Sequence, residues 1–300
     1  MRILVVGATG FIGTEFVKSA RIEGHEVFGC GRSPWGEKTA LLFPCREDYW
    51  SMEDGQIPSQ IWKQIDAVVL LASKRPYKGF NYEDYKENVN TAEKLMEEAV
   101  TYGITNFVFA SSKAVYSGPD MPWKENTACI PSSLYGASKL AAEQLGLYFN
   151  NQGMLHFKSL RFAQVIGLGE RKGYLINTLI DNAREKKAQT VFGTGKQRRQ
   201  YVYIKDVCKA IMTAINKPMA EGTFNIGIPG NTSNLELAVA VNTAFSNEGN
   251  LTHDFSHEMF GTDDEMDVTK ARELLGFHAE YGIMETFADL AKLYDCNDIH

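Results

Sequence analysis

The chain begins with a short apolar run, residues 3–6, that leads into a glycine-rich turn and then a helical pattern. Glycines at this spacing allow a tight turn, close approach of the backbone to a pyrophosphate, and close packing of helix on strand. The N–H groups at the helix start would face the phosphates. Because a strand precedes the turn and a helix follows it, we expect a dinucleotide site. Its contact residues would be Gly7, Thr9, Gly10, Phe11, Ile12 and Gly13.

Apolar runs and helical patterns alternate along the chain, which predicts an α/β fold with a Rossmann-type, doubly wound parallel sheet. Expected strands lie at residues 3–6, 26–30, 67–71, 107–110, 156–161 and 201–204. Expected helices lie near 11–24, 82–101, 134–150, 173–186, 206–216, 234–247 and 283–294. We assign residues 1–165 to a dinucleotide-binding domain and 166–300 mainly to a smaller α/β substrate lobe. Within that lobe, 201–206 is a candidate for returning to the sheet.

Composition excludes several classes of protein. The 31 basic and 37 acidic side chains give a net charge of −6, and no basic run offers a nucleic-acid surface. No apolar run approaches the roughly 20 residues of a membrane span. The first residues do not resemble a secretory signal. The five cysteines and six histidines form no convincing metal-ligand pattern. We therefore expect a cytoplasmic protein without a metal site, a nucleic-acid partner or a membrane partner.

The end of the second expected strand bears on the choice between NAD and NADP. Sites that prefer NAD carry an Asp or Glu there, whereas a nearby Arg accommodates the 2′-phosphate of NADP. This chain has Gly31, Arg32 and Ser33, with no carboxylate. Arg32 and Ser33 could receive a phosphate; alternatively, Arg32 stacks on adenine or lies in solvent. Both cofactors stay open, with NADP slightly favoured.

A Tyr-x-x-x-Lys pair indicates an acid/base site only in the right context. On a helix, residues four apart share one face, and a Lys near the phenol lowers its pKa and favours the phenolate. The chain has three such pairs, Tyr82/Lys86, Tyr135/Lys139 and Tyr201/Lys205. Only Tyr135/Lys139 is on an expected helix that follows a strand ending in a polar pair, Ser111-Ser112. We therefore choose Tyr135 as the catalytic residue.

Taken in order, these motifs resemble those of the extended short-chain dehydrogenase/reductases, also called the NAD-dependent epimerase/dehydratase family. The resemblance covers nearly the whole chain. The segments that carry it are Gly7-x-x-Gly10-x-x-Gly13, residues 110–116, Tyr135-x-x-x-Lys139, residues 160–167, 199–206 and 222–227, and the terminal stretch 267–277.

The resemblance implies a role for each matching residue. Ser112 would hydrogen-bond the reacting group, Tyr135 would move its proton, and Lys139 would tune Tyr135 and hold the nicotinamide ribose. Other implied roles are cofactor contact for Ala72, adenine contact for Asp48 after the third strand, loop support for Asn88, and substrate contact for Gln164 and Arg199. The family also implies a homodimer formed through the helices at 82–101 and 134–150.

Departures from the family pattern narrow the expected activity. The 4,6-dehydratases of the family carry Asp-Glu after the active-site Ser or Thr, where this chain has Lys113-Ala114. We therefore expect no dehydratase, but an NAD(P)-dependent nucleotide-sugar 4-epimerase. One alternative is an NADPH-dependent reductase of a 4-keto nucleotide sugar, and a second is a non-catalytic NAD(P)-sensing regulator. Gln200 in place of Asp, and Lys74-Arg75 after the fourth strand, also depart from the pattern on the substrate side.

Overall fold

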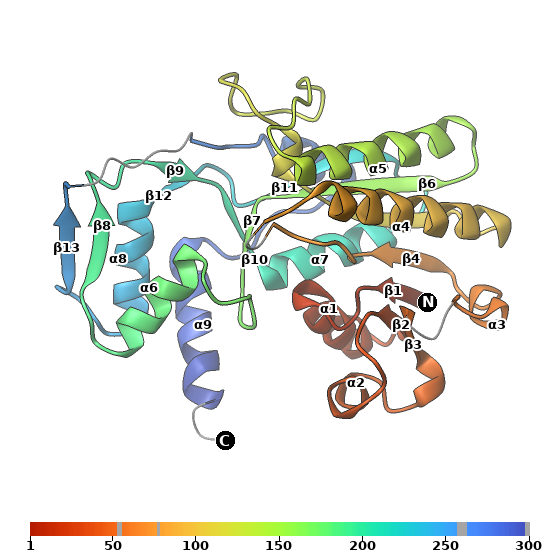
Figure 1. Ribbon diagram of the computed structural model, residues 1–300, viewed down its shortest axis with the longest axis horizontal. Helices are drawn as coiled ribbons and strands as arrows, with labels where there is room; N and C mark the ends of the chain where they lie inside the picture. The colour runs from red at the N-terminus through yellow and green to blue at the C-terminus, as the bar shows by residue number, and fades with distance from the viewer. Residues whose placement is uncertain (53–55, 77–78, 257–262, 298–300) are drawn as a thin grey trace.

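A parallel sheet of seven strands forms the centre of the computed structural model, which describes residues 1–52, 56–76, 79–256 and 263–297 (Figure 1). Its order is β11-β6-β5-β4-β1-β2-β3. The strands are β1 (Arg2–Val6), β2 (Glu26–Gly31), β3 (Tyr49–Ser51), β4 (Ala67–Leu70), β5 (Asn106–Ser112), β6 (His156–Phe162) and β11 (Gly222–Ile226). The strand order reverses between β1 and β4, and ligands bind at such a switch point, beyond the carboxyl ends of the strands. This confirms the predicted fold.

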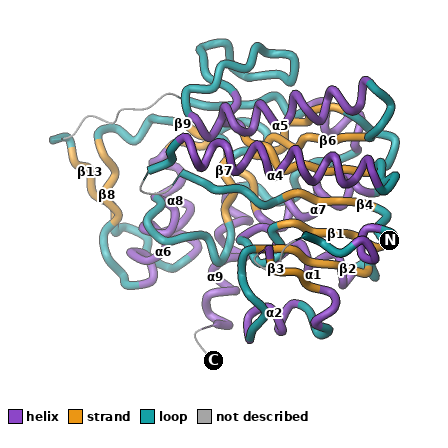
Figure 2. The backbone as a smooth tube through the Cα atoms, turned by 45° about the vertical axis from the view of Figure 1, so that its right-hand side comes forward, coloured by secondary structure: helices purple, strands orange, loops and turns teal. Residues whose placement is uncertain are grey.

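Helices cover both faces of the sheet, because successive strand side chains point to opposite sides. Ile3 and Val5 pack toward α1 (Phe11–Ile22) and α7 (Ile204–Ile215). Leu4 and Val6 pack toward α4 (Tyr82–Thr101) and α5 (Leu134–Asn151). The last two helices run side by side over their face (Figure 2). A continuous apolar run is thus needed to fill both layers.

A smaller lobe lies beyond the carboxyl ends of the strands, with its own apolar cluster (Figure 1). Its helices are α6 (Leu175–Arg184), α8 (Asn234–Ala244) and α9 (Ile283–Asn297). Its paired strands are β8 (Gln189–Phe192) with β13 (Leu251–Asp254), β9 (Arg198–Arg199) with β12 (Thr232–Ser233), and β7 (Gln164–Ile166) with β10 (Tyr201–Tyr203). Short elements elsewhere are α2 (Glu37–Leu42), α3 (Ser59–Trp62), the 3₁₀ turns Arg46–Asp48 and Lys113–Val115, and a π turn, Ala271–Leu275.

The expectation that residues 201–206 return to the sheet is wrong. β10 pairs with β7, outside the large sheet, and residues from Ile204 onward belong to α7. The segment that returns is β11, which pairs in parallel with β6 at the edge of the sheet. Asn225 and Thr223 interrupt the apolar pattern of this strand, and both are buried. Its polar composition is why periodicity does not identify it.

The described residues contain neither a membrane-spanning helix nor a cluster of metal ligands. Over residues 1–52, 56–76, 79–256 and 263–297, no helix is both long and apolar enough to cross a membrane. In the same ranges, no three His, Cys, Asp or Glu side chains are grouped so that they could hold a metal ion.

Gly146 lies where α5 packs closely against β6 of the sheet. A Cβ added there would lie 2.4 Å from ring atoms of Phe157 on β6. We expect Gly146→Val to lower the free energy of unfolding by about 2 kcal/mol or more, as overpacking does. Urea denaturation would measure it. Gln144→Val, at an exposed site on the same helix, is the matched control; equal losses in the two variants would contradict the packing argument.

Candidate active site

The glycine-rich turn joins β1 to α1 by close backbone contacts. Gly7 has a φ of 93°, and its N–H donates to the carbonyl oxygen of Cys30 at 2.7 Å. A Cβ on Gly13 would lie 2.1 Å from the carbonyl oxygen of Gly7, and one on Gly7 would lie 2.6 Å from the Ala72 nitrogen. Only glycine therefore fits where the helix start approaches β1 and β4.

The start of α1 is open to a ligand. Its N-cap residue, Gly10, offers no side-chain cap to the first turn, and uncapped N–H groups at a helix start suit phosphate oxygens. A cavity of about 980 Å³ opens there. Its lining includes nine of the predicted cofactor residues: Gly7, Thr9, Gly10, Phe11, Ile12, Gly13, Arg32, Ser33 and Ala72. The backbone and the cavity thus fit a dinucleotide.

One end of the cavity is formed by residues that follow β2 and β3. The Thr9 and Ser33 hydroxyls lie 3.3 Å apart, and the Tyr49 hydroxyl donates to the Ser33 carbonyl at 2.7 Å. Arg32 is exposed and lines the cavity, as does Met52, the residue that follows β3. At the end of β2 the chain therefore offers a guanidinium and a hydroxyl rather than a carboxylate.

Asp48 does not follow the third strand, so that part of the expectation is wrong. It ends a 3₁₀ turn that precedes β3, and it is absent from the residues that line the cavity. Burial raises the pKa of Asp48, and the nearby Arg21 lowers it. Ser51 pairs with Gly31 at the carboxyl end of the sheet, so Met52 occupies the ligand edge. A strand of three residues is too short for a periodic signal to place it.

Ser112, Tyr135 and Lys139 come together outside the cavity lining, near Arg75, which does line the cavity. Ser112 ends β5, and Tyr135 is in the first turn of α5, whose N-cap Ser133 accepts from the Gly136 N–H. A Cβ on Gly136 would lie 2.0 Å from the Ala114 carbonyl oxygen, so glycine allows the helix start to approach the end of β5.

The Tyr135 phenol lies among three polar side chains. Burial raises its pKa, whereas the Arg75 guanidinium and a hydrogen bond with Ser112 lower it. The Lys139 ammonium lies 5.7 Å from the centre of the Tyr135 ring and donates to the Ala110 carbonyl at 2.8 Å. Of the two other Tyr-x-x-x-Lys pairs, Tyr82 is exposed on α4, and the Tyr201 pair spans the junction of β10 and α7.

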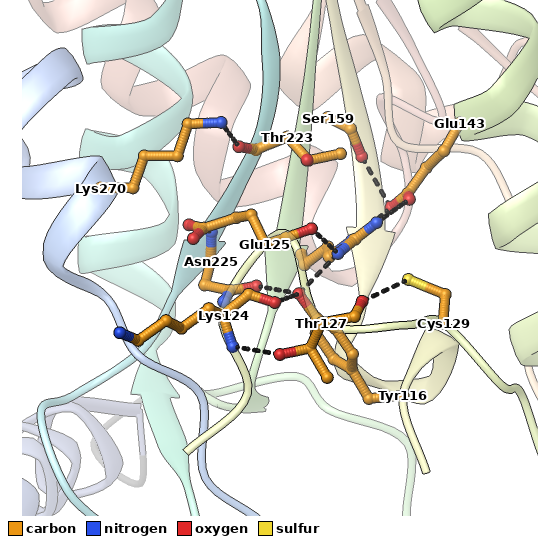
Figure 3. Close-up of polar contacts among 11 residues, drawn as sticks. Tyr116, Lys124, Glu125, Thr127, Cys129, Glu143, Ser159, Thr223, Asn225 and Lys270 are labelled. Carbon is orange, nitrogen blue, oxygen red and sulfur yellow. Dashed lines mark hydrogen bonds and ion pairs between the residues drawn. The ribbon is translucent and has the colours of Figure 1, made fainter. Parts of the chain in front are cut away.

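Lys139 is held in a buried environment. Burial lowers its pKa to about 7, opposed by the Glu143 carboxylate one turn further along α5. Glu143 forms a bidentate pair with Arg161 on β6, with Nη2–Oε2 and Nε–Oε1 distances of 2.5 and 3.0 Å, and it accepts from Ser159 at 2.9 Å (Figure 3). Arg161 also donates to the Tyr116 hydroxyl. This polar network fixes the face of α5 that carries Lys139.

Asn88 connects the loop after β4 to α5. Its side chain accepts from the Lys74 N–H at 2.7 Å and donates to the Lys74 carbonyl at 3.1 Å. Its Nδ2 also lies 3.3 Å from the Ser138 hydroxyl, which donates to the Tyr135 carbonyl. Asn88 therefore ties this loop to α5, and its role as support for the active-site loop stays a prediction.

The predicted substrate residues Gln164 and Arg199 lie outside the lining of the 980 Å³ cavity. Gln164 begins β7, and its N–H donates to the Gln200 carbonyl. Arg199 is on β9, near an ion pair of 2.5 Å between Lys113 and Asp264. No role is predicted from the sequence for several other residues that line the cavity, most of which lie in loops, with Glu87 and Thr91 on α4. These are Met52, Leu71, Ser73, Lys74, Arg75, Glu87, Thr91, Gly169, Arg171 and Tyr174.

A model of the NAD dependent epimerase/dehydratase family matches residues 3–227. The chain belongs to this family. A Bacillus subtilis (strain 168) protein described as an uncharacterized UDP-glucose epimerase is 29% identical, over 98% of this chain and 99% of its own length. The solved UDP-N-acetylglucosamine 4-epimerase from Bacillus cereus is 28% identical, with a TM-score of 0.82 over 98% of this chain and 99% of that one.

A second solved structure, MoeE5 in complex with UDP-glucuronic acid and NAD, is 27% identical. Its TM-score is 0.82, over 99% of this chain and 100% of that one. Family membership confirms the resemblance drawn from the motifs. It also agrees with the prediction of a nicotinamide dinucleotide as cofactor.

The pKa of Lys139 makes the stability of this family member depend on pH. Unfolded, Lys139 keeps its ordinary pKa of 10.5, whereas folded it loses its proton near pH 7. Between these values unfolding takes up a proton, so this residue destabilises the fold most at low pH and stability rises with pH. We expect the free energy of unfolding of Lys139→Met, minus that of the parent, to decrease steadily from pH 6.5 to 9.5. The variant is thus most favoured at low pH, where the parent holds a buried charge.

Urea denaturation at several pH values measures this gap. Lys38→Met, at an exposed position, is the control and should follow the pH dependence of the parent. A gap for Lys139→Met that stays constant with pH would show that Lys139 keeps its proton in the fold.

Proposed function

We propose that this protein is an NAD(P)-dependent nucleotide-sugar 4-epimerase that acts by transient oxidation and re-reduction at C4 of the sugar. The observation that carries the proposal is the meeting of Ser112, Tyr135 and Lys139 at the carboxyl end of β5, near Arg75, which lines a cavity that fits a dinucleotide. Similar proteins named as UDP-glucose and UDP-N-acetylglucosamine 4-epimerases support the choice of substrate class.

The residues around the glycine turn would hold the cofactor. The N–H groups at the start of α1 suit its diphosphate, Thr9, Arg32 and Ser33 would take one ribose, and Lys139 the other. A bound nicotinamide supplies the hydride acceptor and donor for the sugar carbon. Asp48 lies away from the cavity lining and has no part in this proposal.

Proton transfer is the task of Tyr135. As the C4 hydroxyl becomes a carbonyl, the phenolate oxygen of Tyr135 takes its proton, and the same oxygen returns it when the carbonyl is reduced. Ser112 hydrogen-bonds the reacting oxygen and the phenol. Lys139 donates hydrogen bonds from a buried position, and Asn88 holds the loop after β4 against α5. Gln164 and Arg199 would contact the substrate, Arg199 through its diphosphate.

We also infer that dehydration is not the reaction. Removing water from the sugar needs an acid and a base beside the reacting carbons. At the two positions after Ser112 the chain has Lys113, whose ammonium is paired with Asp264, and Ala114, which has no ionisable group. Neither provides the carboxylate pair found in the dehydratases of the family.

Arg32 favours one alternative, an NADPH-dependent reductase of a 4-keto nucleotide sugar. It lines the cavity beside Ser33 where a 2′-phosphate would lie. Tightly co-purifying NAD⁺ supports the epimerase. A protein isolated without cofactor that consumes NADPH with a 4-keto sugar supports the reductase.

For the assembly, we propose a homodimer formed through α4 and α5. The two helices pack together and leave Tyr82, Leu134 and Tyr148 with 61%, 43% and 55% of their surfaces exposed. These side chains provide apolar surface that a second copy would cover.

Replacing the catalytic phenol tests the proposed reaction. We expect Tyr135→Phe to reduce the interconversion of C4-epimeric nucleotide sugars about 10²- to 10⁴-fold, because the general acid/base is lost. Product ratios from UDP-glucose, UDP-N-acetylglucosamine and UDP-glucuronate, followed by NMR, would measure it. Tyr82→Phe, in the surface pair on α4, is the matched control. Full activity of Tyr135→Phe, or no interconversion of any of the three sugars by the cofactor-loaded parent, would overturn the proposal.

Arg32→Ala tests which cofactor is used. If Arg32 binds a 2′-phosphate, its loss removes a charge-assisted contact of about 1.5–3 kcal/mol, so NADP should bind roughly ten- to hundredfold more weakly. NAD affinity should change little. Calorimetric titration of both cofactors measures the difference, and Lys38→Ala serves as the control for net charge. An equal loss for the two cofactors would rule out the phosphate contact.

A further inference from the structure

The loop after β4 meets the loop after β7 through one partly buried ion pair. Arg75 Nη2 lies 3.2 Å from Glu170 Oε1, and the Glu170 side chain is only 1% exposed. The Tyr174 hydroxyl donates to the Pro76 carbonyl at 3.1 Å, and the Arg75 guanidinium lies 5.7 Å from the centre of the Tyr174 ring. These contacts fix Arg75 between the two halves of the chain.

The same loop is held against the helix that carries the phenol. The Asn88 side chain hydrogen-bonds both the N–H and the carbonyl of Lys74. It also lies 3.3 Å from the Ser138 hydroxyl, which donates to the Tyr135 carbonyl. Phe80, further along the loop, places its ring edge-on to the Tyr135 ring at 5.8 Å. Arg75, next to Lys74, is therefore confined to the neighbourhood of Tyr135.

We propose that Arg75 is a positioning residue for Tyr135: its guanidinium, held by Glu170, supplies the positive charge that stabilises the phenolate. The proposal uses the proposed function only for its kinetic readout. Arg75 is a departure of this chain from the family pattern, and it gives the phenol a second cation beside Lys139.

The charges around the phenol favour Arg75 over Lys139 in this role. Arg75 lowers the pKa of Tyr135 more than the hydrogen bond with Ser112 does, while Tyr174 raises it. Lys139 itself has a pKa lowered to about 7, in part by Arg75. A guanidinium keeps its charge throughout this pH range, so Arg75 is the cation whose charge does not change while Tyr135 titrates.

Glu170 sets how much of that charge reaches the phenol. Burial raises its pKa and Arg75 lowers it, and its Oε2 is buried without a hydrogen-bond partner in the part of the chain that the structure describes. Arg75 is thus the group that compensates this carboxylate. The exposed 38% of the Arg75 side chain lies at the cavity. A ligand that displaces water there would reduce screening and strengthen the effect on Tyr135.

Removing the charge should raise the pKa of the phenol. In Arg75→Met we expect the acid limb of the kcat/KM profile, which reports formation of the phenolate, to move up by about one pH unit. Arg75→Lys should restore most of the shift. Glu170→Gln, which removes the opposing charge, should move the limb down. Lys172→Met, which removes an exposed cation of the same loop outside the cavity lining, is the matched control and should leave the limb in place.

An optical titration gives a readout that needs no sugar. Tyrosinate absorbance near 295 nm is followed in the cofactor-loaded protein, and the signal of Tyr135 is obtained by subtracting the same variant with Tyr135→Phe. The midpoint should rise in Arg75→Met and fall in Glu170→Gln. Circular dichroism confirms that each variant is folded.

A lower rate at every pH with an unmoved midpoint would show that Arg75 is merely structural and would overturn the inference. If no nucleotide sugar is turned over but the midpoints shift as expected, the role of Arg75 stands and the proposed function alone has failed.

Discussion

The buried pair of Glu143 and Arg161 is the contact on which the rest of the site depends. Both side chains are almost fully removed from water, at 0% and 3% exposed, and removing one partner of such a pair typically costs about 3–5 kcal/mol. The pair joins α5 to the neighbouring strand β6, and through Tyr116 and Asn225 it reaches β11 at the edge of the sheet (Figure 3). Lys139, one helical turn from Glu143, takes its position and its electrostatic surroundings from this network.

Much of the fold follows from local physics that a sequence displays. A glycine-rich turn between an apolar strand and a helix can adopt few backbone conformations, so this unit could be predicted. The bounds of the long amphipathic helices could also be predicted closely, as α4 at Tyr82–Thr101 shows. The Tyr135/Lys139 pair could be distinguished from the two other Tyr-x-x-x-Lys pairs because it alone is on an expected helix that follows a strand ending in Ser111-Ser112. The structure then brings Ser112 to the phenol, as the order of strand and helix requires.

The features that could not be predicted depend on pairing between distant segments. β3 is three residues long, so Asp48 was expected on the wrong side of it. β11 carries buried Thr223 and Asn225, which no periodic pattern would select for a strand. Arg75 matters through Glu170, which lies 95 residues away in the chain. Each of these depends on tertiary contacts rather than on local preference.

The position of β11 has a consequence for how such a protein can be divided. A fragment ending after β6 would leave that strand's backbone N–H and C=O groups unpaired along an open edge, which is a template for association with other chains. It would also lack α7, which covers part of one face of the sheet. The family match ends at residue 227, one residue after β11. The smallest unit with the complete seven-stranded sheet therefore includes a segment from the second half of the chain, and recombination between relatives would have to exchange both pieces together.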